Sequence, residues 1–302
     1  MKLLLTGHTG FLGSEIYKSL KDSFEINLLT RHPIKSKNCF NLNNEKDIYE
    51  SLKGVSAVIH CAAKNVDKQD NNKKSFEASK RFNVNFTKKL ARYAESSGVN
   101  KFIFVSTAKV YGEFSFKGAF NENDTLDPIG NYAMSKALAE NSLKSFCKKR
   151  KMKYVILRPP IILGKNSKGN LSMLKSLSRL SLPLPLGQFN KHKRSIIFID
   201  TLVKIIELCI TDDRASNAVF NVAEHENYSF LNLVKIFAEL NGTKSIHFSI
   251  PMVIIRLLSY FLGKKSLIDK MYYPFELDTS YVKDKLRWKP KNNTHELFKD
   301  LI

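Results

Sequence analysis

The sequence has few cysteines, glycines and prolines. The four cysteines in 302 residues, at positions 39, 61, 147 and 209, form no CxxC pair. This spacing argues against a disulfide framework and against a metal site, and it is typical of reduced thiols in a cytoplasmic protein. With only 13 Gly and 9 Pro, the chain is neither collagen-like nor disordered. Its length predicts one large globular domain or two smaller ones.

A long hydrophobic run is also missing, since no stretch reaches the ~20 apolar residues of a membrane-spanning helix. The best candidate, residues 250–262, is interrupted by a proline, an arginine and a serine. Two interpretations stay open. We favour an amphipathic helix packed on the core, and the alternative is a helix that rests on an anionic membrane surface beside Lys264 and Lys265. Membrane contact is therefore expected to be peripheral at most.

Acidic residues are scarce as well: 49 Lys+Arg against 28 Asp+Glu give a net charge of +21. Such a charge can indicate nucleic-acid binding. Most of the cations, however, are lysines scattered among asparagines, without a basic motif interleaved with aromatic residues. We expect a Lys-rich solvated surface and no nucleic-acid partner. A locally positive cleft for an anionic substrate is compatible with this charge.

Short apolar runs alternate with helical patterns in the N-terminal half, as in βαβ units. Strands are expected at Lys2–Leu5, Glu25–Leu29, Val55–His60, Lys101–Ser106, Val155–Leu157, Ser195–Ile199 and Ala218–Val222, and helices at Phe11–Leu20, Phe76–Ser97, Tyr132–Lys149 and Leu171–Leu180. This order predicts an α/β fold, a doubly wound parallel sheet of the Rossmann type with a smaller, partly interleaved C-terminal region. Residues 1–165 would form the dinucleotide-binding domain, whose sheet also receives 195–225. Residues 166–194 and 226–302 would form the substrate-binding region.

A glycine-rich loop follows the first strand and opens the first helix. Glycines there allow a tight turn and a close approach of the backbone to a pyrophosphate, while the helix N-terminus offers free N–H groups. The position of the motif directly after an N-terminal strand predicts dinucleotide binding. The residues expected at the cofactor are Gly7, Thr9, Gly10, Phe11, Leu12 and Gly13.

The end of the second strand bears on which dinucleotide is bound. An acidic residue there would bind the ribose 2′-hydroxyl of NAD, but the chain has Arg31, 21 residues after Gly10. A guanidinium can pair with a 2′-phosphate, so NADP(H) is favoured and NAD(H) is the alternative. In that alternative Arg31 stacks on the adenine or points to water.

Tyr132 and Lys136 lie four residues apart, on one face of a predicted helix. The same spacing occurs at four other places in this Lys-rich chain, but only Tyr132 lies shortly after a strand that ends near Thr107. A neighbouring ammonium would lower the pKa of the phenol, which makes Tyr132 a usable acid or base near neutral pH. Thr107 would hold the substrate oxygen by a hydrogen bond.

With these motifs the chain resembles the extended short-chain dehydrogenase/reductase family, the NAD(P)-dependent epimerase/dehydratase group that acts on nucleotide sugars. The resemblance covers nearly the whole length and rests on Thr6–Gly13, on residues 58–63 (VIHCAA), 83–85 (NVN), 105–112 (VSTAKVYG) and 132–136 (YAMSK), and on 157–160 (LRPP). It implies a catalytic trio of Thr107, Tyr132 and Lys136, with Lys136 also holding the ribose. It also implies cofactor contacts at Ala62, Ala63, Asn83 and Pro159, and no metal.

Departures from the family pattern reduce the number of reactions that the chain could catalyse. Sugar 4,6-dehydratases carry an Asp-Glu pair directly after the catalytic Thr, where this chain has Ala108 and Lys109. The Cys of 3,5-epimerase-reductases is also absent from that stretch. The favoured activity is NADPH-dependent reduction of the C4 keto group of a UDP-linked sugar, such as a 6-deoxy-N-acetylhexosamine. The alternatives are a UDP-hexose or UDP-N-acetylhexosamine 4-epimerase with tightly bound NAD, and a non-enzymatic dinucleotide sensor.

The second half of the chain resembles the family's sugar-nucleotide positions. Asn170 and Arg194 match residues that contact the diphosphate, although Arg194 could equally be a surface residue of a basic run. The subgroup implied is the one encoded with bacterial surface-polysaccharide enzymes. The helices expected at Phe76–Ser97 and Tyr132–Lys149 match those that form a four-helix dimer interface in relatives, so a homodimer is expected.

Overall fold

Two parallel sheets occur in the part of the chain that the computed structural model describes, residues 1–34, 36–64, 73–165, 167, 170–180, 182–290 and 294–301. The larger sheet has seven strands in the order β3-β2-β1-β4-β5-β6-β9. Their bounds are β1 Lys2–Thr6, β2 Glu25–Thr30, β3 Cys39–Asn41, β4 Ala57–His60, β5 Lys101–Val105, β6 Lys153–Arg158 and β9 Ala218–Asn221. The strand order reverses between β1 and β4, where such sheets bind ligands. The predicted doubly wound α/β fold is confirmed.

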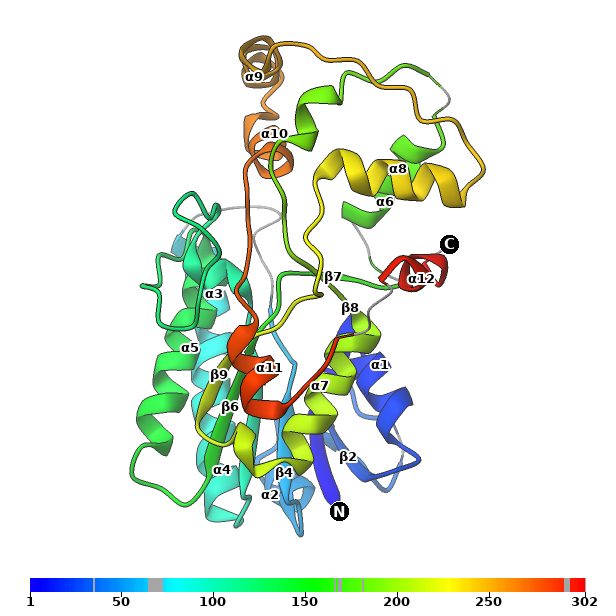
Figure 1. Ribbon diagram of the computed structural model, residues 1–302. Helices are drawn as coiled ribbons and strands as arrows, with labels where there is room; N and C mark the ends of the chain where they lie inside the picture. The colour runs from blue at the N-terminus through cyan, green and yellow to red at the C-terminus, as the bar shows by residue number, and fades with distance from the viewer. Residues whose placement is uncertain are drawn as a thin grey trace.

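Helices cover both faces of this sheet (Figure 1). One face carries α1 Phe11–Leu20, α7 Ile199–Thr211 and α11 Ser280–Leu286, and the other carries α2 Glu45–Leu52, α4 Thr87–Ser96 and α5 Asn131–Cys147. Side chains alternate along each strand, because successive residues point to opposite faces. On β1, for example, Leu3 and Leu5 join the core under α1 and α7, whereas Leu4 joins the core under α2 and α4. The sheet is thus buried on both faces, as parallel sheets require.

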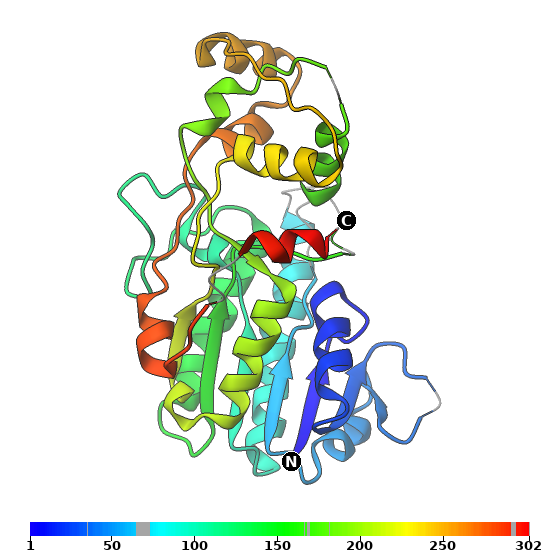
Figure 2. The same ribbon diagram turned by 45° about the vertical axis from the view of Figure 1, so that its right-hand side comes forward.

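A smaller part of the protein lies beyond the carboxyl ends of the strands (Figures 1 and 2). It contains α6 Asn170–Ser178, α8 Phe230–Leu240, α9 Met252–Phe261, α10 Lys265–Tyr272 and α12 Thr294–Lys299. We call this part the cap. The second sheet, β7 Ile161–Leu163 paired with β8 Ile196–Phe198, leads into it. Residues 195–225 were expected to extend the main sheet. Strand β9 does so, whereas β8 pairs with β7 instead.

Several elements differ from those expected. The helix predicted at Phe76–Ser97 is a continuous succession of α3 Lys73–Ser79, a π-helix η1 Lys80–Phe86, and α4. Strand β3 and helix α2 had no counterpart among the expected elements. Residues 250–262 pack on the protein only in part: Met252 and Ile255 are partly buried against the hydrophobic cluster of the cap, but Ser259 is the only fully buried residue of α9. No helix in the described ranges is long and apolar enough to cross a bilayer.

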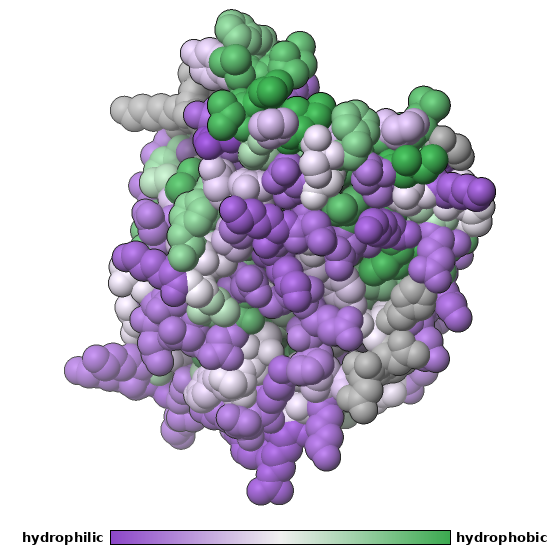
Figure 3. All heavy atoms as spheres, turned by 45° about the horizontal axis from the view of Figure 1, so that its top comes forward, coloured by the Kyte–Doolittle hydropathy of each residue, from purple (hydrophilic) through white to green (hydrophobic). Residues whose placement is uncertain are grey.

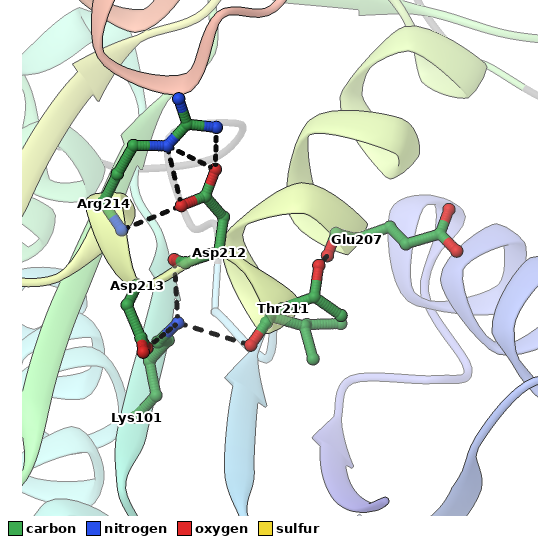
Figure 4. A network of polar contacts seen from close by, with 7 residues as sticks. Lys101, Glu207, Thr211, Asp212, Asp213 and Arg214 are labelled. Carbon is green, nitrogen blue, oxygen red and sulfur yellow. Dashed lines mark hydrogen bonds and ion pairs between the residues drawn. The ribbon is translucent and has the colours of Figure 1, made fainter.

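A buried lysine joins the main sheet to the end of α7 (Figure 4). Lys101, at the start of β5, is 6% exposed, and its Nζ donates to the carbonyls of Ile210, at 3.3 Å, and Asp212, at 3.0 Å. It also lies 3.6 Å from the exposed carboxylate of Asp213. The last carbonyls of a helix lack partners within the helix, and a cation there also complements the helix dipole. Lys101 therefore caps α7 from the neighbouring strand.

Replacing Lys101 by Met should leave these carbonyls buried without a donor. We expect the free energy of unfolding, measured by urea titration, to fall by about 1–3 kcal/mol. Lys204→Met, at an exposed position of α7, is the matched control and should change stability little. Equal stability of the two variants would contradict the capping role.

Candidate active site

The loop between β1 and α1 needs glycine at two positions for steric reasons. Gly7 has φ +82°, and a Cβ there would lie 2.7 Å from the backbone nitrogen of Ala62, which follows β4. A Cβ on Gly13 would lie 2.1 Å from the carbonyl oxygen of Gly7. Any side chain at either position would push the loop away from β4 or the helix away from the loop. The glycines thus bring the start of α1 to the point where the strand order reverses.

The N-terminus of α1 presents donors to the adjoining cleft. Its N-cap residue, Gly10, supplies no side-chain hydrogen bond, and its first turn contains no acidic residue. Beside it, His8 Nδ1 is buried without a hydrogen-bond partner among the described residues, and burial lowers the pKa of this imidazole. Free N–H groups at a helix N-terminus favour a phosphate. The loop therefore fits the diphosphate of a dinucleotide.

One cleft of about 870 Å³ at the carboxyl edge of the sheet brings together the three residues predicted to be catalytic and part of the glycine loop. Thr107 follows β5, and Tyr132 and Lys136 lie on the first turns of α5. The remaining lining includes Thr9, Gly10, Phe11, Leu12, Ser14, Cys61, Ala63, Val105, Ser106, Pro159, Pro160, Ile161, Ile162 and Ser167. A phenol, an ammonium and a hydroxyl thus share one cleft with the glycine loop.

Lys136 is held deep in this cleft. It is 1% exposed, its Nζ donates to the carbonyl of Val105 at 2.6 Å, and it lies 3.9 Å from the ring centroid of Phe104. Burial lowers the pKa of Lys136 to about 7, partly opposed by the nearby Cys61 and Glu140. An anion or a phenolate formed beside Lys136 would favour its charged form. Its charge is therefore sensitive to what occupies the cleft.

Asn83 positions the cleft rather than lining it. It is buried within the π-helix η1, where its Oδ1 accepts from the backbone N–H of Lys64 at 2.8 Å. Its Nδ2 donates to the Lys64 carbonyl at 3.0 Å and to Ser135 Oγ at 2.8 Å. Asn83 thus connects the segment after β4 to α5, between Tyr132 and Lys136. π-helical turns are frequent at functional sites.

A buried ionic network that the sequence analysis missed lies next to Thr107. Glu140 Oε1 accepts a short hydrogen bond from Ser106 Oγ, and Glu140 Oε2 accepts from Arg158 Nη2 at 2.7 Å. Arg158 Nη1 donates in turn to the hydroxyl of Tyr111 at 2.6 Å. Glu140 lies one helical turn after Lys136, and Arg158 belongs to the LRPP motif. The sequence therefore shows both residues next to recognised motifs, but it contains no local pattern that pairs two distant segments.

A second cleft, of about 1030 Å³, carries Arg31. Its cationic lining residues are Arg31, Lys64, Arg81 and Lys89. The guanidinium of Arg31 lies 5.6 Å from the ring centroid of Phe82. Lys64 directly follows Ala63, which lines the first cleft, so the two clefts approach each other after β4. Arg81 is a further cation in this cleft, and no sequence motif singles it out.

The two residues expected at the substrate diphosphate are less informative. Asn170 begins α6, but its side chain lies outside the described residues. Arg194 is partly buried: its Nη1 donates to the carbonyl of Tyr273 at 2.8 Å, and burial lowers its pKa to about 10. Neither lines the described part of the two clefts. Within the described ranges, no group of three or more His, Cys, Asp or Glu residues is placed to hold a metal ion.

A buried histidine connects the strand ends beneath the cleft. His60, the last residue of β4, bonds through Nδ1 to Thr6 Oγ1 at 2.6 Å and through Nε2 to Thr87 Oγ1 at 2.9 Å. Burial, and to a lesser degree the positive charge of Lys136, lowers its pKa to about 3. The neutral imidazole therefore bridges β1, β4 and α4.

This histidine predicts a measurable pH dependence of stability. The unfolded chain takes up a proton at His60 below pH 6.5, whereas the folded chain does not until about 3, so stability is lost as the pH falls through this window. His60→Gln should remove about 1.4 kcal/mol per pH unit of that loss between about pH 6 and pH 4. Urea unfolding of both proteins across the window measures it. Parallel curves would show that the folded protein protonates His60.

Comparisons with known proteins agree with this geometry. Residues 3–223 match the model of the NAD dependent epimerase/dehydratase family. A UDP-glucose 4-epimerase of Vibrio cholerae is 32% identical to this chain. The aligned region covers 98% of this chain and 93% of the Vibrio protein. The fold is similar to that of the Thermotoga maritima UDP-glucose 4-epimerase with UDP-glucose (TM-score 0.76, 21% identity, 100% of this chain and 97% of that chain). It is also similar to RMD from Pseudomonas aeruginosa with NADPH (0.76, 17%, 100% and 98%). The chain belongs to the NAD dependent epimerase/dehydratase family, enzymes of the extended short-chain dehydrogenase/reductase type.

Proposed function

We propose that the protein is a 4-epimerase of a UDP-linked hexose or N-acetylhexosamine, with NAD as a retained cofactor. The observation that carries this proposal is the single cleft that holds Thr107, Tyr132 and Lys136 together with the N-terminus of α1. The full-length similarity to a protein named UDP-glucose 4-epimerase favours this reaction over the 4-reduction that the sequence alone favoured.

The mechanism follows from the three side chains. Tyr132 would accept the proton of the C4 hydroxyl while C4 is oxidised to the ketone, and would return it to the C4 oxygen after the keto sugar has turned its other face toward the cofactor. Thr107 donates a hydrogen bond to the C4 oxygen as its negative charge develops. Lys136 stabilises the phenolate of Tyr132 and binds the ribose hydroxyls. A nicotinamide bound beside these residues would accept the hydride from C4 and later return it to the same carbon.

The residues after Thr107 support this choice over dehydration. Elimination of water from the sugar needs one group to protonate the leaving hydroxyl and another to abstract the C5 proton. Here a 3-10 helix, η2 Ala108–Tyr111, follows Thr107 directly and supplies no carboxylate. Hydride transfer at C4 needs neither group, so it is compatible with this segment.

The organisation of the chain suggests where each ligand binds. We propose that residues 1–165 with 195–225 hold the dinucleotide, through the cofactor contacts expected from the sequence. The cap residues, 166–194 and 226–302, would hold the UDP-sugar, with Asn170 and Arg194 toward the diphosphate. A homodimer through α4 and α5, and a role in surface-polysaccharide precursor synthesis, remain predictions.

One observation favours a second candidate, an NADPH-dependent 4-reductase. Arg31 and Arg81 line the same cleft, together with Lys64 and Lys89. Several cations there would bind the 2′-phosphate that distinguishes NADP from NAD. An epimerase that recycles bound NAD gains nothing from such a site.

Removing the phenolic hydroxyl tests the mechanism. Tyr132→Phe should lower kcat by at least about 100-fold while leaving dinucleotide affinity, measured by fluorescence titration, nearly unchanged. The control is Tyr281→Phe. Tyr281 and Lys285 on α11 have the same spacing as Tyr132 and Lys136, and Lys285 Nζ donates to the Tyr281 hydroxyl at 2.8 Å, but neither residue lines the two clefts. Full activity of Tyr132→Phe would exclude Tyr132 as the acid and base.

The choice between the two reactions requires one assay panel. We expect interconversion of UDP-glucose or UDP-N-acetylglucosamine with their C4 epimers, no net cofactor consumption, and NAD in the purified protein. Stoichiometric oxidation of NADPH with a UDP-4-keto sugar would overturn the epimerase in favour of the reductase. In that case Arg31→Ala should weaken NADPH binding at least about tenfold relative to NADH.

A further inference from the structure

Helix α9, at the far end of the cap, exposes an apolar face to solvent. Its exposed side chains, with those of the residue that follows it, are all hydrophobic: Val253, Ile254, Leu257, Leu258, Tyr260, Phe261 and Leu262. Val253 is 78% exposed and Phe261 77%. In the space-filling view a hydrophobic surface lies at the top of the molecule, on the side of the cap (Figure 3). Large contiguous apolar patches on a protein surface mark interaction sites.

The exposed side of α9 differs from that of an ordinary surface helix. Such a helix buries its apolar side and exposes its polar side. Here Ser259 is the one buried residue, and Arg256 is half-buried, with Nε 3.3 Å from the carboxylate of Asp269 on α10. Met252 and Ile255 are partly buried beside these two polar residues and pack on the hydrophobic cluster of the cap, so α9 rests on the cap by a narrow mixed side and turns its larger apolar side to solvent. This arrangement is stable in an apolar environment and unfavourable in water.

Basic side chains stand beside the apolar face. Lys264 and Lys265 follow α9 and are exposed, and they form no ion pair within the described residues. The whole chain carries a net charge of +21. A helix that combines a continuous apolar face with adjacent lysines binds in the interface of an anionic bilayer, its apolar side chains inserted and its cations at the headgroups.

We propose that α9 attaches the protein to the surface of an anionic lipid membrane, lying in the plane of the interface. A second copy of this chain is the less favoured occupant, because a contact through α9 would bring together the lysines of two strongly basic chains. This attachment does not depend on the reaction proposed above, since α9 lines neither cleft.

Vesicle co-sedimentation of the whole protein tests the proposal. We expect binding to vesicles of equal parts phosphatidylglycerol and phosphatidylcholine, and weak binding to phosphatidylcholine alone. The double variant Val253→Glu, Phe261→Glu should lose at least about tenfold in affinity. The variant Lys264→Glu, Lys265→Glu should lose about tenfold or more on the anionic vesicles only.

A control of equal charge separates insertion from electrostatics. Ile34 and Tyr49 are also exposed apolar residues, 68% and 48%, and they lie outside the cap. Changing both to Glu alters the net charge as much as the α9 variant does, but should leave vesicle binding much less affected. Circular dichroism verifies that each variant is folded.

A fluorescence probe reports the insertion directly. The chain has one tryptophan, Trp288, so Phe261→Trp adds a second one on α9. Its emission should shift to shorter wavelength when the anionic vesicles are added. Three results would overturn the proposal: no sedimentation with anionic vesicles, equal losses in the α9 and control variants, or a dimer that the α9 variant dissociates while no vesicle binds.

Discussion

The ion pair between Glu140 and Arg158 is the interaction on which the geometry of the cleft depends. Both side chains are almost completely buried, at 0% and 2% exposure. A charge buried there would be costly without its partner, so the two segments that carry them must meet. Glu140 fixes α5 at the turn after Lys136, and Arg158 fixes the end of β6 before Pro159. Because Glu140 also accepts from Ser106, the residue before Thr107 is held by the same carboxylate.

Local patterns predicted the parts of the site that depend on sequence neighbours. The glycine loop could be placed because its glycines lie within a few residues of one another, directly after one strand and before one helix. Tyr132 and Lys136 could be paired because one helix carries both. Thr107 could be added because a parallel sheet brings its strand ends to one edge. The doubly wound sheet followed from the alternation of strands and helices.

Interactions between distant segments were not predictable in this way. Arg158 and Glu140 are 18 residues apart, and no spacing rule connects a strand end with the middle of the preceding helix. Strand β8 pairs with β7 instead of joining the main sheet, and this partner could not be predicted because the strands of both sheets are similarly apolar. For α9, composition alone was ambiguous: a helix that is apolar on most sides can face either the core or another apolar medium, and only its packing decides.

The π-helix η1 has a consequence for the residues on either side of it. A π turn contains one more residue than an α turn, and each residue of an α-helix turns the chain by about 100°. The faces of α3 and α4 are therefore offset from those of one regular helix. Glu77, Arg81 and Lys89 line the second cleft, whereas Asn83, between Arg81 and Lys89 in the sequence, is turned inward to Ser135. The irregular winding of this segment therefore affects which side chains line the second cleft and which support α5.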